Sequence, residues 1–440
     1  MAADGEDAGR LAFFEGLLGT SAKLQPRLVA GKGLGVFLAP GASVAEGEVL
    51  FGEDPDGLFQ MRTQPLACDH CARLLGTLDF QMRLLADSDA RPDDGCAGQV
   101  ALPGIADKSE AQLADARRGW AAWRPEAWFC SEACESAHRT EFGKLLGKEE
   151  LVRDFVDHAI QCRTPFFVIA LRVLLKGSGL LPNLLRRPYW ECVDKCEEDP
   201  VAQVEEMKAD LMASWELLKK MKLVGIIPAT MDDYACLVGS LCLNAVAVKY
   251  ANPLIYYIQE VDQGRGGPEA KETLIPVLED LRQARLRHAE AVRAAAEVDA
   301  SESGEASDGA DSESDLEDDE LQFAWPRRAG APCAFSTRLF PPMKGYGLYP
   351  RLSALNHSCD PNAEVVFAGS SRLLVVARRD LKEGEEVCIS YIDHEEEDRA
   401  ERQKGLDSYG FVCDCSRCRP AKKRRAVRRR PAAAAAPSGQ

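Results

Sequence analysis

Eight of the sixteen cysteines fall into two groups whose spacing suits metal binding. The first group is Cys68 and Cys71, followed by Cys130 and Cys134. A C-x2-C turn brings two thiolates together, and tetrahedral zinc needs four such ligands at about 2.0–2.3 Å. The alternative is a redox pair or a chance pairing, but the second pair follows in a polar, glycine-rich region that could not otherwise form a core. The spacing therefore favours one structural zinc on these four thiols.

The second group is Cys413, Cys415 and Cys418, which supplies three thiolates from six residues. Three ligands leave tetrahedral zinc one short, so the fourth must come from elsewhere in the chain. Most of the remaining cysteines lie in apolar or helical contexts, where a free thiol behaves as a small hydrophobic group.

Four further motifs combine glycine, polar and aromatic residues in a specific order. Gly345–Asn362 contains the run Asn356-His-Ser-Cys359-Asp-Pro-Asn362, and Gly384–Asp393 is an apolar strand that ends in Ser-Tyr391-Ile-Asp. Tyr409-Gly-Phe411 then leads into the second cysteine group, and near the start Gly31–Phe37 carries a glycine-x-glycine turn at Gly33 and Gly35. A lone glycine turn is weak evidence, because glycines simply allow tight turns.

Together these motifs closely resemble a SET domain with its post-SET segment, over roughly residues 24–420. A zinc finger and a helical segment lie between the first SET strands and the catalytic half. That layout is seen in SMYD-type methyltransferases and in plant trithorax-related proteins, and the run Arg187–Cys192 favours the plant branch. The resemblance implies an α+β fold of small sheets with a knot-like crossing.

The resemblance also implies an activity, that of an S-adenosylmethionine-dependent protein-lysine N-methyltransferase, with histone as the expected substrate. Tyr391 and Tyr409 would be catalytic, and Tyr409 and Phe411 would line the channel for the substrate lysine. The expected cofactor-binding residues are Lys32, Gly33, Leu34, Gly35, Asn244, Asn356, His357, Tyr391 and Phe411. For Asn244, which follows a capping box at Thr230–Asp233, a satisfied buried amide is the alternative.

The zinc ligands can be completed from the same resemblance. Cys359 would be the fourth ligand beside Cys413, Cys415 and Cys418, where the metal would hold the post-SET segment over the active site. Residues 68–140 resemble a MYND finger that has lost its second ligand pair. We therefore expect two structural zinc ions per chain, with Cys96 and His138 unmetallated.

The order of segments gives a domain plan. Apolar periodicity predicts helices over 149–175 and 204–224, and a third helix is expected over 269–298. The expected units are a flexible N-terminus (1–23), the first part of the SET domain (24–67), a reduced MYND-like finger (68–140), a helical insertion (141–258), a helix plus an acidic disordered insertion (259–332), the catalytic half (333–394), the post-SET segment (395–420) and a basic disordered tail (421–440).

Charge is concentrated in two segments of this 440-residue chain, whose formal net charge is -16. Asp299–Glu320 holds eleven acidic residues and no basic one, whereas Lys422–Arg430 holds seven basic residues. Such runs are too polar to pack into a core. The acidic run is most simply a solvated loop, with binding of a basic partner or serine phosphorylation as alternatives, and the basic tail suits nuclear import or contact with nucleic acid.

Location and partners follow from the same features. The start lacks a secretory signal, and the longest uncharged stretch, Tyr234–Val248, is too short to span a bilayer. We expect a nuclear and also cytoplasmic monomer that binds a protein substrate, avoids membranes and contacts nucleic acid only through its basic tail. The rival hypothesis is a catalytically silent scaffold that binds partners through the reduced finger and the acidic loop.

Overall fold

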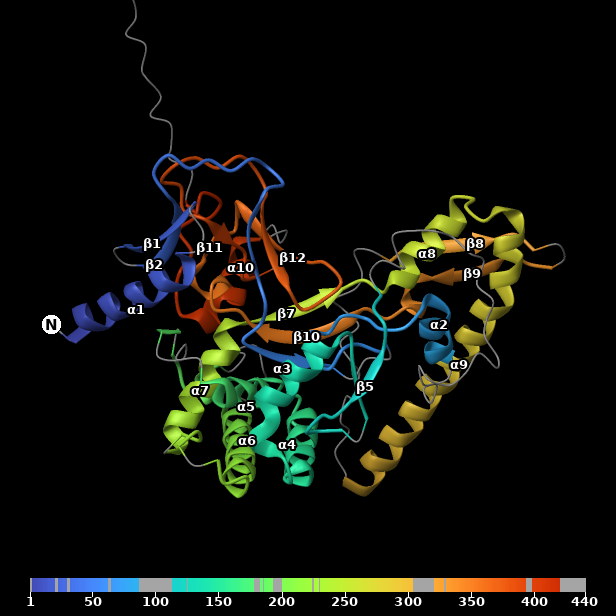
Figure 1. The fold of residues 1–440 in the computed structure, drawn as a ribbon, viewed down its shortest axis with the longest axis horizontal. Coiled ribbons are helices and arrows are strands. Elements are labelled where there is room, and N and C mark those ends of the chain that lie inside the picture. The colour runs from blue at the N-terminus through green and yellow to red at the C-terminus, as the bar shows by residue number, and fades with distance from the viewer. Residues whose placement is uncertain are drawn as a thin grey trace, which may run out of the picture.

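The structure is a computed structural model, and it describes residues 2–19, 23–29, 32–61, 65–86, 113–124, 126–177, 183–184, 186–192, 200–223, 225–228, 230–303, 320–327, 330–392 and 398–419. Helices and small, mostly antiparallel sheets make up these residues, as Figure 1 shows. The expected α+β class is confirmed. Cys96, most of the acidic run and the basic tail lie outside the described residues.

Strands from the two ends of the chain pair with each other. The first hairpin is β1 (Leu24–Val29) with β2 (Gly33–Leu38). Two three-stranded sheets follow, β12-β13-β3 (Ala363–Phe367, Leu373–Ala377, Val49–Glu53) and β4-β10-β7 (Gly57–Gln60, Met343–Leu348, Ala245–Tyr250). A short parallel pair joins β11 (Asn356–His357) to β14 (Cys388–Ile389). The two sequence segments predicted to form the SET domain, 24–67 and 333–394, thus pair with each other in the same sheets.

Alternation along these strands explains why they form. In β13, Leu373, Val375 and Ala377 are buried, while the residues between them are half-buried, as a strand with one face on the core requires. The same core takes Val36 and Leu38 from β2. The motifs at 356–362 and 384–391 therefore lie next to strands that are fixed in an apolar core.

The described part of the helical insertion contains four long helices, where we expected one over 149–175, one over 204–224 and one opened by the capping box at Thr230–Asp233. They are α4 (Glu149–Gln161), α5 (Phe166–Lys176), α6 (Pro200–Lys220) and α7 (Met231–Asn244). The prediction of one helix over 149–175 is wrong, because the chain breaks at 162–165. Pro165 disfavours helical backbone at the residue before it, and Arg163 adopts a φ of 51°.

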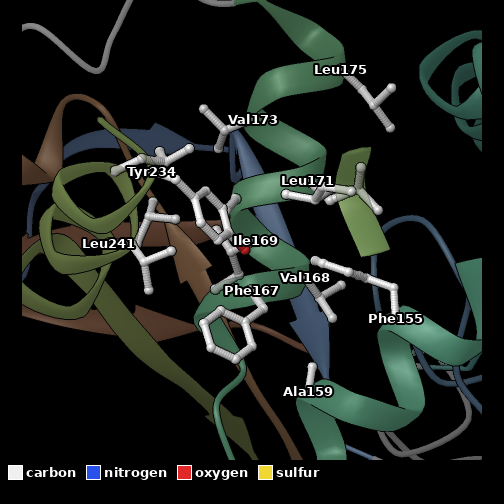
Figure 2. Close-up of a cluster of buried hydrophobic side chains, with 14 of the residues drawn as sticks. Phe155, Ala159, Phe167, Val168, Ile169, Leu171, Val173, Leu175, Tyr234 and Leu241 are labelled. Atoms are coloured by element: carbon white, nitrogen blue, oxygen red, sulfur yellow. The ribbon is translucent and has the colours of Figure 1, made fainter. Parts of the chain in front are cut away.

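The core of this insertion surrounds α5. Figure 2 shows Phe167, Ile169 and Leu171 of α5 packed together with side chains from the neighbouring helices, Phe155 of α4 and Tyr234 of α7 among them. Most residues of α5 are buried, so the helix is surrounded by other elements rather than exposed on one face. The insertion is anchored to the SET sheets by α5, which packs on β4.

A separate apolar cluster forms around the third predicted helix. It combines α2 (Leu78–Ala86), α8 (Pro253–Asp262), α9 (Gly267–Ser303) and the hairpin of β8 (Gln322–Trp325) and β9 (Cys333–Ser336), which Figure 1 shows together at one end of the molecule. Trp325 is fully buried there and its indole N–H donates to Asp262. The expected unit 259–332 is therefore completed by α2, from the predicted finger region, and by β9.

The N-terminus is helical where we expected flexible chain. Helix α1 spans Ala2–Leu18, and Phe14 and Leu18 are buried in the core that includes β2. Arg351 also donates from Nε to the Leu17 carbonyl at 3.0 Å. The expectation missed this helix because its first turns are acidic and glycine-containing, whereas its apolar residues lie near its end.

The finger and post-SET segment add the remaining regular elements. They are β5 (Arg117–Gly119), β6 (Ala127–Phe129) and α3 (Glu132–Phe142) in the finger, and α10 (Arg399–Leu406) before the last cysteines. Among the described residues, no helix combines the length and apolar character that a membrane span needs.

Candidate functional site

The glycine turn at the start of β2 lies against Asn356 and Glu386. Asn356 Nδ2 donates to the Leu34 carbonyl at 2.9 Å and to Glu386 Oε1 at 2.7 Å. A Cβ at Gly35 would lie 2.8 Å from Glu386 Oε1 and 3.0 Å from Asn356 Nδ2, so a larger residue there would displace the two side chains that hold the turn. Gly33 has a φ of 78°, which also favours glycine. The structure thus brings Gly33, Leu34, Gly35 and Asn356 together, as predicted.

Lys32 lies at the same turn but faces two carboxylates. Its Nζ is 3.8 Å from Glu386 Oε2 and 3.8 Å from an Asp414 carboxylate oxygen. These long ion pairs are exposed or half-buried, so each stabilises the fold weakly. Their presence shows that the Lys32 charge is already shared between the SET domain and the post-SET segment.

Tyr391 is fixed by hydrogen bonds at its backbone and at its hydroxyl. Its backbone N–H donates to His357 Nδ1 at 3.0 Å, and its hydroxyl donates to the Leu355 carbonyl at 2.5 Å. Burial raises the pKa of Tyr391 above its ordinary value, so the phenol stays neutral. The hydroxyl oxygen keeps its lone pairs available in a fixed direction.

His357 connects this tyrosine to the second cysteine group. Because its Nδ1 accepts a hydrogen bond, a neutral ring carries its proton on Nε2, which lies 3.2 Å from Cys359 Sγ. Burial, and to a lesser extent the Arg402 charge, lower the pKa of His357 to about 4. The ring is therefore neutral near pH 7 and donates to the cysteine sulfur.

Three aromatic rings face each other beside this network. The ring centroids of Tyr391 and Tyr409 are 4.9 Å apart, and Phe411 lies 6.5 Å from each of them. Phe411 is 38% exposed, which leaves one edge of the cluster open to an incoming side chain. The structure therefore brings together the residues predicted to line a lysine channel.

Asn244 ends α7 as expected, but its amide bonds within its own helix. Nδ2 donates to the Ser240 carbonyl at 2.7 Å. This contact agrees with the alternative of a satisfied amide, and cofactor contact by Asn244 stays a prediction. Burial also raises the pKa of Tyr409 in the aromatic cluster, so this phenol is neutral as well.

The four thiols of the second group meet as zinc would require. Cys359, Cys413, Cys415 and Cys418 have all their sulfur atoms within 4.8 Å of one another. Cys359 Sγ lies 3.8 Å from Cys413 Sγ and 3.6 Å from Cys418 Sγ. A tetrahedron with Zn–S bonds of about 2.3 Å has sulfur atoms about 3.8 Å apart. The donor set and its dimensions therefore fit zinc.

Neighbouring residues fix the cysteine loop on the SET domain. Gln403 of α10 accepts the Cys413 backbone N–H at 3.1 Å and donates to the Phe411 carbonyl at 2.9 Å. Arg402 lies 3.7 Å from Cys418 Sγ, where its positive charge stabilises a thiolate. The thiol cluster and the aromatic cluster are thus joined through Gln403 and the backbone between Phe411 and Cys413.

The finger holds the other thiol cluster. The sulfur atoms of Cys68, Cys71, Cys130 and Cys134 lie within 4.8 Å of one another, and Cys71 Sγ is 3.6 Å from Cys130 Sγ. Buried Asp69 braces the loop, because its carboxylate accepts the Trp128 backbone N–H at 2.8 Å. Within the described residues, these are the two cysteine or histidine clusters with metal-site dimensions, and His138 belongs to neither.

His138 is instead packed among aromatic rings. It is fully buried, with ring centroids 4.9 Å from Trp123, 5.2 Å from Phe129 and 4.6 Å from Phe142. Neither of its ring nitrogens has a hydrogen-bond partner in the described part of the chain. Burial lowers its pKa to about 2, so the ring is neutral when folded.

We expect His138→Phe to stabilise the protein. Phenylalanine removes two unsatisfied nitrogens, a gain of about 1–3 kcal/mol. The unfolded histidine has a pKa near 6.5 and the folded one is lower, so wild-type stability is lost as pH falls below about 6.5. The advantage of the variant should grow by about 1 kcal/mol between pH 7.5 and 5.5. Thermal denaturation at both pH values measures it, and a lower melting temperature in the variant contradicts it.

Comparison with known proteins now identifies the domain. The family model for the SET domain matches residues 269–392, which include β10, the Asn356 motif and Tyr391. The chain contains a SET domain. It is 50% identical to human histone-lysine N-methyltransferase SMYD3 over 74 residues, which cover 17% of each chain. It is 48% identical to human protein-lysine N-trimethyltransferase SMYD5 over 79 residues, covering 17% of this chain and 19% of that protein.

A plant relative matches less closely. Identity to histone-lysine N-methyltransferase ASHR2 of Arabidopsis thaliana is 35% over 83 residues, which cover 18% of this chain and 21% of that protein. Within the matched segments, identity is higher to the animal SMYD proteins than to this plant protein. The chain spans about a fifth of the length of each of these relatives, and the match supports a SMYD-like SET domain.

Sequence reasoning missed several residues of the SET site. Glu386 lies inside a recognised motif, and its carboxylate could have been found from that position. Arg10 lies far from any motif, and Arg187, which begins the run Arg187–Cys192, was not expected at this site. Arg187 donates from Nη1 to the Ser408 carbonyl at 2.6 Å and contacts the place where a Cβ at Gly410 would be. No local signal predicts either arginine.

Proposed function

We propose that this protein transfers a methyl group from S-adenosylmethionine to a lysine side-chain amine of a protein. One observation carries the proposal: the consecutive residues Asn356 and His357 join the glycine turn to the aromatic cluster, because Asn356 donates to the Leu34 carbonyl while His357 accepts the Tyr391 backbone N–H and lies 6.0 Å from the Phe411 ring. The SET-domain match and the printed names of the relatives support the same reaction.

The residues present suit this cofactor. When bound, S-adenosylmethionine supplies an electrophilic methyl group on a positively charged sulfur. Gly33 is partly exposed and has no side chain, so a cofactor could approach the backbone of the turn there. The neutral Tyr391 hydroxyl presents oxygen lone pairs, which complement positive charge at a methyl group in transfer.

The aromatic cluster would prepare the substrate amine. A lysine ammonium has an ordinary pKa of about 10.4 and must lose its proton before it can attack. Aromatic walls remove water and so disfavour the charged form, which lowers the pKa of an amine held between them. Tyr391, Tyr409 and Phe411 would then align that amine with the methyl group.

We further propose that each cysteine cluster holds one structural zinc. Both sets offer four thiol sulfurs within 4.8 Å, and thiolates are preferred zinc ligands. The second cluster would fasten the segment that carries Tyr409 and Phe411. Neither zinc would touch the reacting atoms.

The proposed substrate is a histone, and the proposed location is the nucleus with a cytoplasmic fraction. SMYD3 and ASHR2 are named for histone-lysine methylation, whereas SMYD5 is named more generally for protein-lysine trimethylation. A net charge of -16 favours approach of a basic protein over nucleic acid. We propose that the chain acts as a monomer and that Lys422–Arg430 serves as its import or nucleic-acid-binding segment.

Transfer of labelled methyl from S-adenosylmethionine to core histones and to a whole-cell protein extract tests this function. We expect labelled histone bands with zinc-loaded protein. Label only on other proteins would keep the reaction and replace the substrate. No label under conditions where a known SET enzyme is active would favour the catalytically silent scaffold.

We expect Arg187→Gln to raise the KM for the protein substrate by about tenfold while kcat and the KM for the cofactor change less. Arg187 holds the Ser408 carbonyl, which directly precedes Tyr409, and loss of one charge-assisted hydrogen bond is worth about tenfold. Steady-state kinetics measure both constants. Arg186→Gln is the matched control, because Arg186 is exposed. An unchanged substrate KM contradicts the role.

A further inference from the structure

Helix α1 is a fixed part of the SET core. Phe14 and Leu18 are buried against the strands of the first hairpin, and Arg351 bonds to the Leu17 carbonyl. Figure 1 shows α1 beside β1 and β2. Residues four apart share one face of a helix, so Arg10 projects on the same side as Phe14 and Leu18. The helix therefore directs Arg10 toward the hairpin.

Arg10 reaches the glycine turn itself. Its Nη1 lies 3.9 Å from the place where a Cβ at Gly33 would be. Its charge also acts on Tyr391, whose raised pKa it partly lowers. The guanidinium is thus placed at Gly33, on one side of the proposed cofactor site.

The other cation at this turn is less suited to bind an anion. Lys32 Nζ is 3.8 Å from both Glu386 and Asp414, and Glu386 also accepts from Asn356. One lysine between two carboxylates leaves that edge with a net negative charge, which suits an ammonium group. The amino-acid end of S-adenosylmethionine carries both an ammonium and a carboxylate, so its carboxylate needs a cation on another side.

We propose that Arg10 is a cofactor-binding residue that binds the carboxylate of the amino-acid end of S-adenosylmethionine. A guanidinium binds a carboxylate through two parallel hydrogen bonds, which is a specific geometry as well as a strong contact. The inference rests on the proposed function and adds a second cation to the expected cofactor-binding residue Lys32. It makes α1 part of the cofactor site.

Two ligands that differ only in the carboxylate test the proposal. S-adenosylhomocysteine carries it, and its decarboxylated analogue, S-adenosyl-3-thiopropylamine, does not. We would measure both dissociation constants by isothermal titration calorimetry on the full chain and on the Arg10→Gln, Arg10→Lys and Lys32→Gln variants. Arg153→Gln is the control, because Arg153 is an exposed arginine on α4.

We expect Arg10→Gln to weaken S-adenosylhomocysteine binding by about tenfold to a hundredfold and to leave the analogue within about threefold. Arg10→Lys should recover part of the loss, and Lys32→Gln should keep most of the preference for the carboxylate. Equal loss of both ligands in Arg10→Gln would show a merely structural role and overturn the proposal. Loss of the preference in Lys32→Gln alone would also overturn it. Wild-type protein that binds neither ligand would overturn the proposed function together with this inference.

Discussion

Tyr391→Phe should reduce the rate of methyl transfer by about 10²–10³-fold, the usual effect of removing one preorganised polar group from an active site. The wild-type hydroxyl is fixed by its bond to the Leu355 carbonyl, and phenylalanine keeps the ring contacts with Tyr409 and Phe411. The fold should therefore survive while the oxygen proposed to face the transferred methyl group is lost. Labelled-methyl transfer under single-turnover conditions measures the rate.

The control for this variant is Tyr256→Phe, since Tyr256 is an exposed residue of α8 far from the aromatic cluster in sequence. Zinc content, melting temperature and affinity for S-adenosylhomocysteine should match the wild type in both variants. If Tyr391→Phe retains transfer within about tenfold of the wild type, the hydroxyl does not have the assigned role.

Cys415→Ser should lower the zinc content from two ions to one per chain and reduce methyl transfer by at least about 100-fold. The reason is the short path from the thiol cluster to the aromatic cluster. Gln403 bonds to both Cys413 and Phe411, and His357 links Cys359 to the Tyr391 backbone. Without the proposed metal, the three remaining thiols no longer hold these groups together. Metal analysis and transfer assays on the same preparation test the coupling.

Cys130→Ser is the matched control for that result. It should also remove one zinc and lower the melting temperature, because Cys130 closes the finger next to buried Phe129. None of the aromatic-cluster residues contacts this site among the interactions the structure gives, so transfer at low temperature should stay within about tenfold of the wild type. Equal loss of transfer in the two variants would contradict a specific role for the post-SET zinc.

Much of this site could be predicted from sequence because its residues belong to short motifs with fixed spacing. The spacing Cys413-x-Cys415-x2-Cys418 and the run from Asn356 to Cys359 specify local turns, and the structure brings these thiols together. The glycine turn at Gly33 was recognisable for the same reason. Such motifs depend on backbone geometry within a few residues, which a single sequence records directly.

The missed features depend on contacts between distant segments. Arg10 becomes part of the site only because α1 docks on the first hairpin, and Arg187 only because the helical insertion meets the 408–410 turn. Neither docking leaves a spacing pattern near the arginine. Pro165, by contrast, was a local signal for the break between α4 and α5 that apolar periodicity outweighed.

The pairing of the two ends of the chain has a consequence for synthesis on the ribosome. Leu34 and Asn356, which hydrogen-bond in the finished site, are 322 positions apart. At translation rates of about 5–20 residues per second, the first hairpin waits roughly 16–64 s for its partner. During that time, β3 and β4 have exposed hydrogen-bonding edges, which are prone to mispairing and aggregation. The finger and the helices are synthesised after β3 and β4 but before the partner strands β10 and β13. A nascent chain must therefore keep β3 and β4 unpaired or shielded until β10 and β13 have been made.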